Sequence, residues 1–180
     1  MEHVRTAGYA VMRSMFDMIQ CGKIVDRVNQ LSLVQAQACV GATRQQFHTL
    51  RCHVDEVDPI LGNFGRDLGE LLAPHHPPMS EDNWPNEITL NRYDGAGFIG
   101  PHRDHACYKH LVAIVSLAGE GTFSVYSRRP GSPIKRTEVL PLRQGDLVLL
   151  GTPSFGRRVT HSVRSNSPNR ISLSFRFISD

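Results

Sequence analysis

The feature that most constrains the fold is a change of pattern at about residue 87, where short strand-like segments begin. These segments are apolar or alternating, and turns of Gly, Pro or Ser separate them, as is typical of consecutive strands. Many short strands in close succession are typical of a β-sandwich or jelly roll. We therefore expect a mainly β protein, with strands at 88–93, 111–117, 122–127, 136–140, 146–150, 159–163 and 170–177.

The residues before this region have a different pattern, and we expect them to be mainly helical. Residues 8–50 contain no proline, and apolar side chains at Met12, Met15, Phe16 and Ile19 recur at helical spacing. These side chains are expected to face the core.

A second helix is predicted over 59–72, where apolar side chains lie on one side. The prolines that follow cannot continue it, so we expect a loop over 73–78 and treat it as a candidate border of the active site. The whole chain, 1–180, is expected to form one domain. In it, residues 1–84 would supply helical support and a candidate substrate-facing segment, and residues 85–180 the strand-rich core.

Length and composition fit one globular domain. The 180 residues are 40% hydrophobic and 21% charged, which is usual for a soluble protein with a sizeable core. No apolar run is long enough for a membrane span, and the first residues lack a secretory pattern, so we expect a cytoplasmic protein. The four cysteines show no C-x-x-C spacing. We expect free thiols, with neither a zinc knuckle nor a disulfide framework.

Charge is distributed unevenly along the chain. Residues 91–180 hold 13 Lys or Arg against 6 Asp or Glu, whereas residues 1–90 hold 7 against 11. A basic carboxyl-terminal half is compatible with an anionic partner such as nucleic acid, and equally with an anionic cosubstrate alone.

A candidate metal site begins with His102 and Asp104, an H-x-D pair. On extended backbone both side chains would lie on one face, because strand side chains alternate. His161, two predicted strands downstream, is the candidate third ligand. Two imidazoles and a carboxylate form a facial triad that binds Fe(II) and leaves coordination positions open. The same donors also serve zinc hydrolases, so the ion is not fixed by the triad alone.

The last predicted strand carries a row of polar side chains on one face. Alternation places Arg170, Ser172, Ser174 and Arg176 together, with apolar residues on the opposite face. An unpaired buried guanidinium is costly, and its planar fork matches a carboxylate. A dicarboxylic cosubstrate is therefore the natural partner. A zinc hydrolase or a sugar-binding cupin would leave these arginines without a role.

Taken in order, an N-x-Y motif, the H-x-D pair, a distal His and two arginines six apart resemble the AlkB-like branch of the Fe(II)/2-oxoglutarate dioxygenases. The resemblance covers about residues 85–180. It implies a double-stranded β-helix (jelly roll) as catalytic core, buttressed by the amino-terminal helices, with Fe(II), 2-oxoglutarate and O2 as cofactor and cosubstrates. Ser172 departs from the pattern, since the bacterial repair enzymes of the family carry Asn there. The departure loosens the assignment to a subfamily.

The resemblance also implies a role for each matching residue. Fe(II) would be bound by His102, Asp104 and His161. The distal carboxylate of 2-oxoglutarate would bind Arg170, with added hydrogen bonds from Asn91, Tyr93 and Ser172. Arg176 would lie near the carboxylate next to the metal and counts among the catalytic residues.

The implied reaction is oxidative removal of alkyl groups from nucleic-acid bases, by C–H hydroxylation with release of an aldehyde, succinate and CO2. A second hypothesis keeps this chemistry but hydroxylates a small metabolite or a protein side chain. A third is a binding module without catalysis that has kept the pocket. The carboxylate of Asp104 favours hydroxylation over halogenation, because a halide would need its coordination position.

The substrate contacts are the least constrained by sequence. A target base must be extruded and stacked on an aromatic ring or a histidine. The main candidates are His105, Trp84 and Tyr108, and others are Tyr9, Tyr126 and Phe155. Trp84 could equally wedge against the barrel. A basic hairpin could contact phosphates or simply be solvated; its cations are Arg128, Arg129, Lys135 and Arg136.

Overall fold

A computed structural model describes residues 1–76, 78–127 and 133–178. The strands of the amino-terminal part are β1 (Tyr9–Met12), β2 (Val34–Gln35), β3 (Cys39–Val40), β4 (Thr43–Gln46) and β5 (His48–His53). Those of the carboxyl-terminal part are β6 (Glu87–Tyr93), β7 (Phe98–His102), β8 (Tyr108–Ala118), β9 (Gly121–Ser127), β10 (Lys135–Leu142), β11 (Leu147–Gly151), β12 (Thr160–Ser165) and β13 (Arg170–Ile178).

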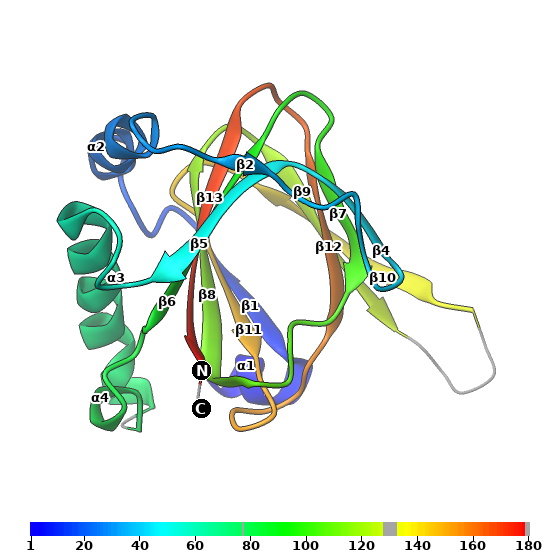
Figure 1. Cartoon of the computed structure of the whole chain (residues 1–180). Coiled ribbons are helices and arrows are strands. Elements are labelled where there is room, and N and C mark those ends of the chain that lie inside the picture. Colours follow the sequence, from blue (N-terminus) through cyan, green and yellow to red (C-terminus); the bar gives the residue numbers. More distant parts are fainter. Residues whose placement is uncertain (77, 128–132, 179–180) are drawn as a thin grey trace.

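The described strands form two antiparallel sheets that face each other (Figure 1). The larger sheet has the order β1-β11-β8-β13-β6-β5-β2, and the smaller one β10-β9-β12-β7-β4-β3. Successive strands from β6 onward are shared between the two sheets, as in a jelly roll. The predicted mainly β fold with a jelly-roll core is therefore confirmed, and each predicted strand has a counterpart.

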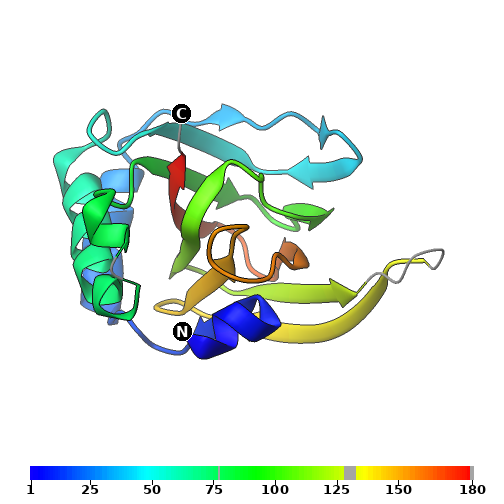
Figure 2. The ribbon, with the colours of Figure 1, turned by 90° about the horizontal axis from the view of Figure 1, so that it is seen from below.

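The helices are α1 (Glu2–Ala7), α2 (Met18–Val28), α3 (Pro59–Leu72), the short 3₁₀ helix η1 (Ala73–His75) and α4 (Pro78–Glu81). Helix α2 begins at Asp17 with a capping box, and α3 begins at Asp58, whose side chain accepts a hydrogen bond from the backbone N–H of Ile60. Apolar side chains of α2 and α3 join those of β6, β8 and β13 in one buried cluster. Helices α2 and α3 thus cover the outer face of the larger sheet (Figure 2).

The prediction that residues 8–50 are mainly helical is wrong on both sides of α2. Met12 lies on strand β1 and is 37% exposed, and Ile19, on α2, is 71% exposed, so neither faces the core as predicted. Residues 34–53 form β2 to β5 instead. Absence of proline permits a helix but does not favour one, whereas Thr43 to Gln46 alternate between half-buried and exposed, the period of a strand. Strand β4 pairs with β7 of the smaller sheet and β5 with β6 of the larger one. This segment, 34–53, therefore bridges both sheets (Figure 1).

The predicted loop over 73–78 is largely η1 and the start of α4. His76 contacts His110, with 3.0 Å between Nε2 and Nδ1, and packs on Phe155. Within the described part of the chain, this segment contributes nothing to the lining of the cavity at the metal centre. None of the described helices is long and apolar enough to cross a membrane.

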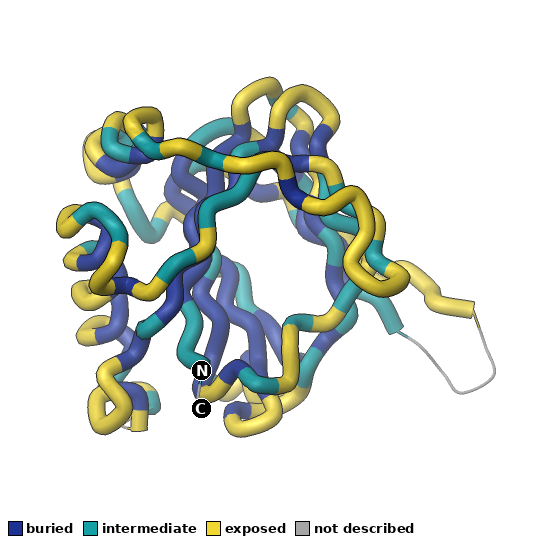
Figure 3. The backbone as a smooth tube through the Cα atoms, viewed as in Figure 1, coloured by how far each residue is buried: buried dark blue, intermediate teal, exposed yellow. Residues whose placement is uncertain are grey.

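Strand β13 lies at the centre of the larger sheet and separates two environments. Ile171, Leu173 and Phe175 point into the cluster shared with the helices. Arg170 and Arg176 point the other way, between the sheets. In Figure 3 the inner strands of the larger sheet are coloured as buried over long, continuous stretches. Of the predicted basic hairpin, Arg128 and Arg129 lie outside the described residues, and Lys135 and Arg136 are exposed at the start of β10.

Candidate metal centre and cosubstrate pocket

The three predicted metal ligands come together at the end of β7. His161 on β12 lies directly opposite His102 on β7, with ring centroids 4.4 Å apart. Strand β7 ends at His102, so Asp104 reaches the site from the residues after the strand and not from the strand itself. Its Oδ1 lies 3.8 Å from His102 Nε2. One donor atom from each of the three residues lies within 4.8 Å of the others.

Hydrogen bonds orient both imidazoles for ligation. Nδ1 of His102 lies 2.9 Å from the carbonyl oxygen of Gly100, and Nδ1 of His161 lies 3.4 Å from that of Val159. With Nδ1 protonated and donating, Nε2 is free to bind a cation. Burial, followed by the charge of His102, lowers the pKa of His161 to about 4. His161 is therefore neutral near pH 7, as a ligand must be.

The third ligand provides a test of whether a cation fits. Oδ2 of Asp104 is buried and has no hydrogen-bond partner among the described residues. A buried carboxylate oxygen without a partner is costly. A divalent cation between Asp104 and the two imidazoles would satisfy it, so the donor set fits Fe(II).

A second unpartnered group lies deeper between the sheets. Arg170 is 1% exposed, and its Nε and Nη1 have no partner in the described structure. Nη2 makes one long hydrogen bond, 3.4 Å, to Ser116 Oγ, and the guanidinium lies over the Tyr93 ring at 4.9 Å. Burial lowers the pKa of Arg170, and Tyr93 opposes this. A cation in this position calls for an anion, and its free nitrogens match a carboxylate.

The register of β13 against β6 explains why the other predicted cosubstrate residues gather here. Arg170 lies opposite Tyr93, and Ser172 opposite Asn91. The Asn91 side-chain oxygen accepts a hydrogen bond of 2.9 Å from Thr49 Oγ1, which fixes the amide. All of these predicted residues line one cavity together with the three metal-ligand candidates. Ser174 and Arg176 of β13 also line the cavity, and the rest of its wall is apolar, namely Ile99, Ile114, Phe123, Leu142, Val148 and Val163.

Arg176 also lines this cavity, close enough to the metal-ligand candidate Asp104 for their charges to interact. Its Nη1 donates to Glu87 Oε1 at 3.3 Å and to Thr89 Oγ1 at 2.5 Å, while Nε is buried without a partner. Burial alone would lower the pKa of Arg176, but Tyr108, Asp104 and Glu87 together raise it. Its free nitrogen and fixed charge suit a second carboxylate beside the metal.

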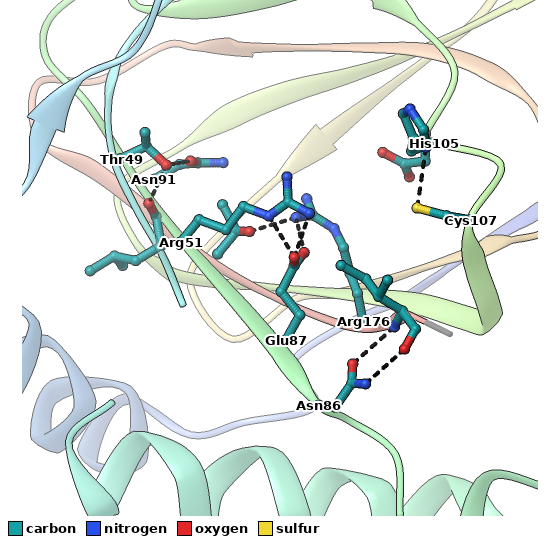
Figure 4. Close-up of polar contacts among 12 residues, drawn as sticks. Thr49, Arg51, Asn86, Glu87, Asn91, His105, Cys107 and Arg176 are labelled. Atoms are coloured by element: carbon teal, nitrogen blue, oxygen red, sulfur yellow. Dashed lines mark hydrogen bonds and ion pairs between the residues drawn. The ribbon is translucent and has the colours of Figure 1, made fainter. Parts of the chain in front are cut away.

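The predicted substrate candidates have separate locations. Tyr108 is buried, with the Arg176 guanidinium 5.1 Å from its ring centroid, and burial raises the pKa of its hydroxyl. His105 is exposed, and its Nδ1 lies 3.1 Å from Cys107 Sγ (Figure 4). Trp84 lies elsewhere: it is 4% exposed, packs on Phe175, and its indole donates to the Leu111 carbonyl. A buried indole has no face to offer a base, so Trp84 is a core residue.

The remaining aromatic candidates also lie outside the metal cavity as described. The Tyr9 hydroxyl donates a hydrogen bond to the Glu138 carboxylate, and the Tyr126 and Ser162 hydroxyls share a hydrogen bond. Phe155 packs against His76.

Several residues of the site had no signal in the sequence. Glu87 lies opposite Arg176 in the register of β6 and β13, and only that register reveals their pairing. Ser116 and Gly121 both contact Arg170. A Cβ at position 121 would lie 2.5 Å from Arg170 Nε, so glycine leaves the space that this side chain occupies. The alternation of β8 could have placed Ser116 on the inner face, but not beside Arg170.

Solved structures with the same fold act in different ways. OsALKBH1 matches with a TM-score of 0.68 and 14% identity, over 94% of this chain and 97% of that chain. A prolyl-4-hydroxylase from Pseudomonas putida matches with a TM-score of 0.67 and 13% identity, over 99% and 96%. SnoN, a non-heme alpha-ketoglutarate-dependent epimerase from nogalamycin biosynthesis, matches with a TM-score of 0.60 and 18% identity, over 94% and 76%. At these identities the likeness shows the fold alone.

The comparison with curated proteins gives no match. The family comparison is decisive, because the model of the 2OG-Fe(II) oxygenase superfamily matches residues 14–176, nearly the whole chain. That family uses Fe(II), 2-oxoglutarate and O2, the groups that the unpartnered Asp104, Arg170 and Arg176 atoms fit. The chain therefore belongs to the 2OG-Fe(II) oxygenase superfamily of oxidoreductases.

Proposed function

We propose that this enzyme is an AlkB-like dioxygenase that removes alkyl groups from nucleic-acid bases, releasing an aldehyde, succinate and CO2. The observation that supports it best is one cavity that joins the H-x-D and distal His ligands to the N-x-Y motif and both arginines. The basic carboxyl-terminal half, with 13 Lys or Arg against 6 Asp or Glu over residues 91–180, supports an anionic polymer as substrate. We also propose a single domain and a cytoplasmic location.

In this proposal the chain's residues bind and orient the metal and the cosubstrate, and they exclude water from the site. His102, Asp104 and His161 hold Fe(II), and the hydrogen bonds at Nδ1 keep both imidazoles in the ligating form. Arg170 would bind the distal carboxylate of 2-oxoglutarate, and Arg176 would bind its other carboxylate. With these groups and O2 bound, the centre supplies the oxidation of a substrate C–H bond.

Hydrogen bonds and apolar walls complete the cosubstrate pocket. Asn91, Tyr93 and Ser172 supply polar contacts from β6 and β13, the two strands that the register aligns. The surrounding isoleucine, valine, leucine and phenylalanine side chains would pack against the methylene groups of the cosubstrate and would exclude water around it. Exclusion of water strengthens each charge interaction inside.

The second candidate function is hydroxylation of a small molecule or a protein side chain by the same centre. Two observations favour it: Trp84 is buried and cannot stack on a base, and the prolyl-4-hydroxylase fold is as similar to this chain as that of OsALKBH1. His105 and Tyr108 stay candidate substrate contacts in either function.

Substrate trials decide between these functions. The protein is incubated with Fe(II), 2-oxoglutarate and ascorbate, together with methylated single-stranded DNA or RNA oligonucleotides. Base dealkylation predicts formaldehyde and an oligonucleotide lighter by one methylene group per event. His102→Ala is the control and should give neither product. Succinate release without any change in the oligonucleotides would contradict dealkylation and favour the second function, and no succinate at all would favour a binding module.

A further inference from the structure

A second cavity, between the segment 34–53 and the core strands, shares His102, Arg176, Asn91 and Ile99 with the cavity of the metal centre, and we call it the mouth of that centre. The lining of this mouth includes Arg51, Arg103 and Arg176, and it also includes the metal-ligand candidate His102. No acidic side chain lines it among the residues that the structure describes. A substrate that presents a C–H bond to the metal through this mouth therefore lies beside guanidinium groups.

Arg51 differs from the other two in how it is held. It lies on β5, and its side chain is 53% exposed. Nε and Nη2 both bond to Oε2 of Glu87, whose side chain is only 9% exposed. Figure 4 shows Arg51 and Arg176 reaching the same carboxylate. Two contacts to one buried acceptor fix the plane of the Arg51 guanidinium, while its outer edge stays open to solvent.

The charges of the site leave a positive surplus at this mouth. Arg51, Arg103, Arg170 and Arg176 line the two cavities, against the carboxylates of Asp104 and of Glu87, which pairs with two of them. The ferrous ion and the 2-oxoglutarate dianion carry opposite charges of equal size and cancel. Four guanidiniums against two carboxylates remain, a surplus of two positive charges. Three of the four guanidiniums line the mouth, and only Arg170 is confined to the inner cavity.

We propose that Arg51 binds an anionic group of the substrate, a phosphodiester or a carboxylate, and that Glu87 positions it. This rests on the proposed function only in taking the adjacent His102 site as the reaction centre. Arg51 is favoured over Arg103 because a guanidinium that is already fixed loses little conformational entropy on binding. Arg103 is exposed, and among the residues that the structure describes its side chain has one hydrogen bond, from Nε to Thr160 Oγ1.

The first test measures binding of a fluorescein-labelled single-stranded DNA 12-mer at several salt concentrations. The protein carries 2-oxoglutarate and Zn(II), a redox-inert substitute for Fe(II). Arg51→Gln should weaken binding about tenfold and lower the slope of log K against log salt by about one ion.

Arg66→Gln is the matched control. Arg66 is 49% exposed, close to the 53% of Arg51, and it is also paired with a carboxylate, but that of Asp55 is exposed and Arg66 lies outside the mouth. This variant should bind the 12-mer like the wild type. A neutral peptide nucleic acid of the same sequence should bind wild type and Arg51→Gln equally.

The second test separates the anion site from the nucleic-acid function. The Nε–H resonance of Arg51, identified by its absence in Arg51→Gln, is followed while methyl phosphate or acetate is added against matched sodium chloride. It should shift, and that of Arg66 should not. If acetate shifts it but the wild type does not bind the 12-mer, the nucleic-acid function is wrong and the site takes a carboxylate. A resonance that responds to neither anion overturns the proposal. Where the wild type does bind the 12-mer, equally tight binding by Arg51→Gln overturns it as well.

Discussion

The two faces of β13 differ in how completely their groups are satisfied. Toward the helices, Ile171, Leu173 and Phe175 are all buried in one apolar cluster. Toward the cavity, Arg170 and Arg176 retain buried nitrogen atoms that no described residue satisfies. Unpaired buried polar groups cost stability, so the apolar face must offset what the cavity face gives up. Strand alternation lets one segment stabilise the fold and bind ligands without mixing the two tasks.

The largest expected effect is on the cavity side and concerns chemistry alone. Asp104→Ala removes a metal ligand and should abolish succinate release from 2-oxoglutarate, because the triad loses its only carboxylate. The melting temperature of the metal-free protein should not fall, since Oδ2 of Asp104 is buried without a partner. Succinate release at the wild-type rate would show that Asp104 is not a ligand.

The helix side of the strand should show the opposite result. Phe175 is fully buried and packs against Phe64 and Trp84. Phe175→Ala should cost about 3–5 kcal/mol in the free energy of unfolding, measured with urea, because it leaves a cavity. In the fraction that stays folded, the 2-oxoglutarate requirement should match that of the wild type. A large change in that requirement would mean that the two faces are coupled.

Arg170 and Arg176 provide a matched pair within the cavity face. Arg170→Met should raise the 2-oxoglutarate requirement about a hundredfold, because a charge-assisted pair is lost. The same variant should stabilise the ligand-free protein, since an unsatisfied buried cation becomes apolar. Arg176→Met should instead destabilise it, because Glu87 and Thr89 lose a donor. Equal changes in the free energy of unfolding of the two variants would contradict the claim that Arg176 stabilises the ligand-free protein and Arg170 does not.

The smallest effect is a pH dependence of the metal-free protein. The folded pKa of His161 is about 4, below its ordinary value of 6.5, so the unfolded chain binds its proton first as pH falls. Stability should therefore be complete above about pH 6.5 and decline toward pH 4. His161→Gln should flatten this decline in melting temperature. His76, whose pKa burial also lowers, contributes in the same direction and stays in the variant.

Much of the cavity could be predicted because its residues lie on strands with clear alternation. Arg170, Ser172 and Arg176 share a face by period alone, and the N-x-Y motif falls opposite them in the register. His161 was placed by order in the chain and by resemblance. The ligand roles of these residues stay predictions, although the geometry brings them together.

Contacts that depend on long-range register could not be predicted. Glu87 meets Arg176 and Arg51 only because β6 lies between β5 and β13. The strands of 34–53 are short and polar, with side chains that are half-buried at most in β4, so their pattern is weak beside that of the core. The sequence left Trp84 open between a stacking ring and a wedge against the barrel. Its burial, which fits the wedge, depends on the packing of α3 against the larger sheet.

The bridge formed by 34–53 has an evolutionary consequence. The segment 34–53 is joined to the barrel at sheet edges, through β4 on β7 and β5 on β6. Its length and sequence can therefore change while the inner strands keep their sequence. Related enzymes could thus acquire new targets by exchanging this one stretch, and grafting it between homologues is a direct way to transfer selectivity.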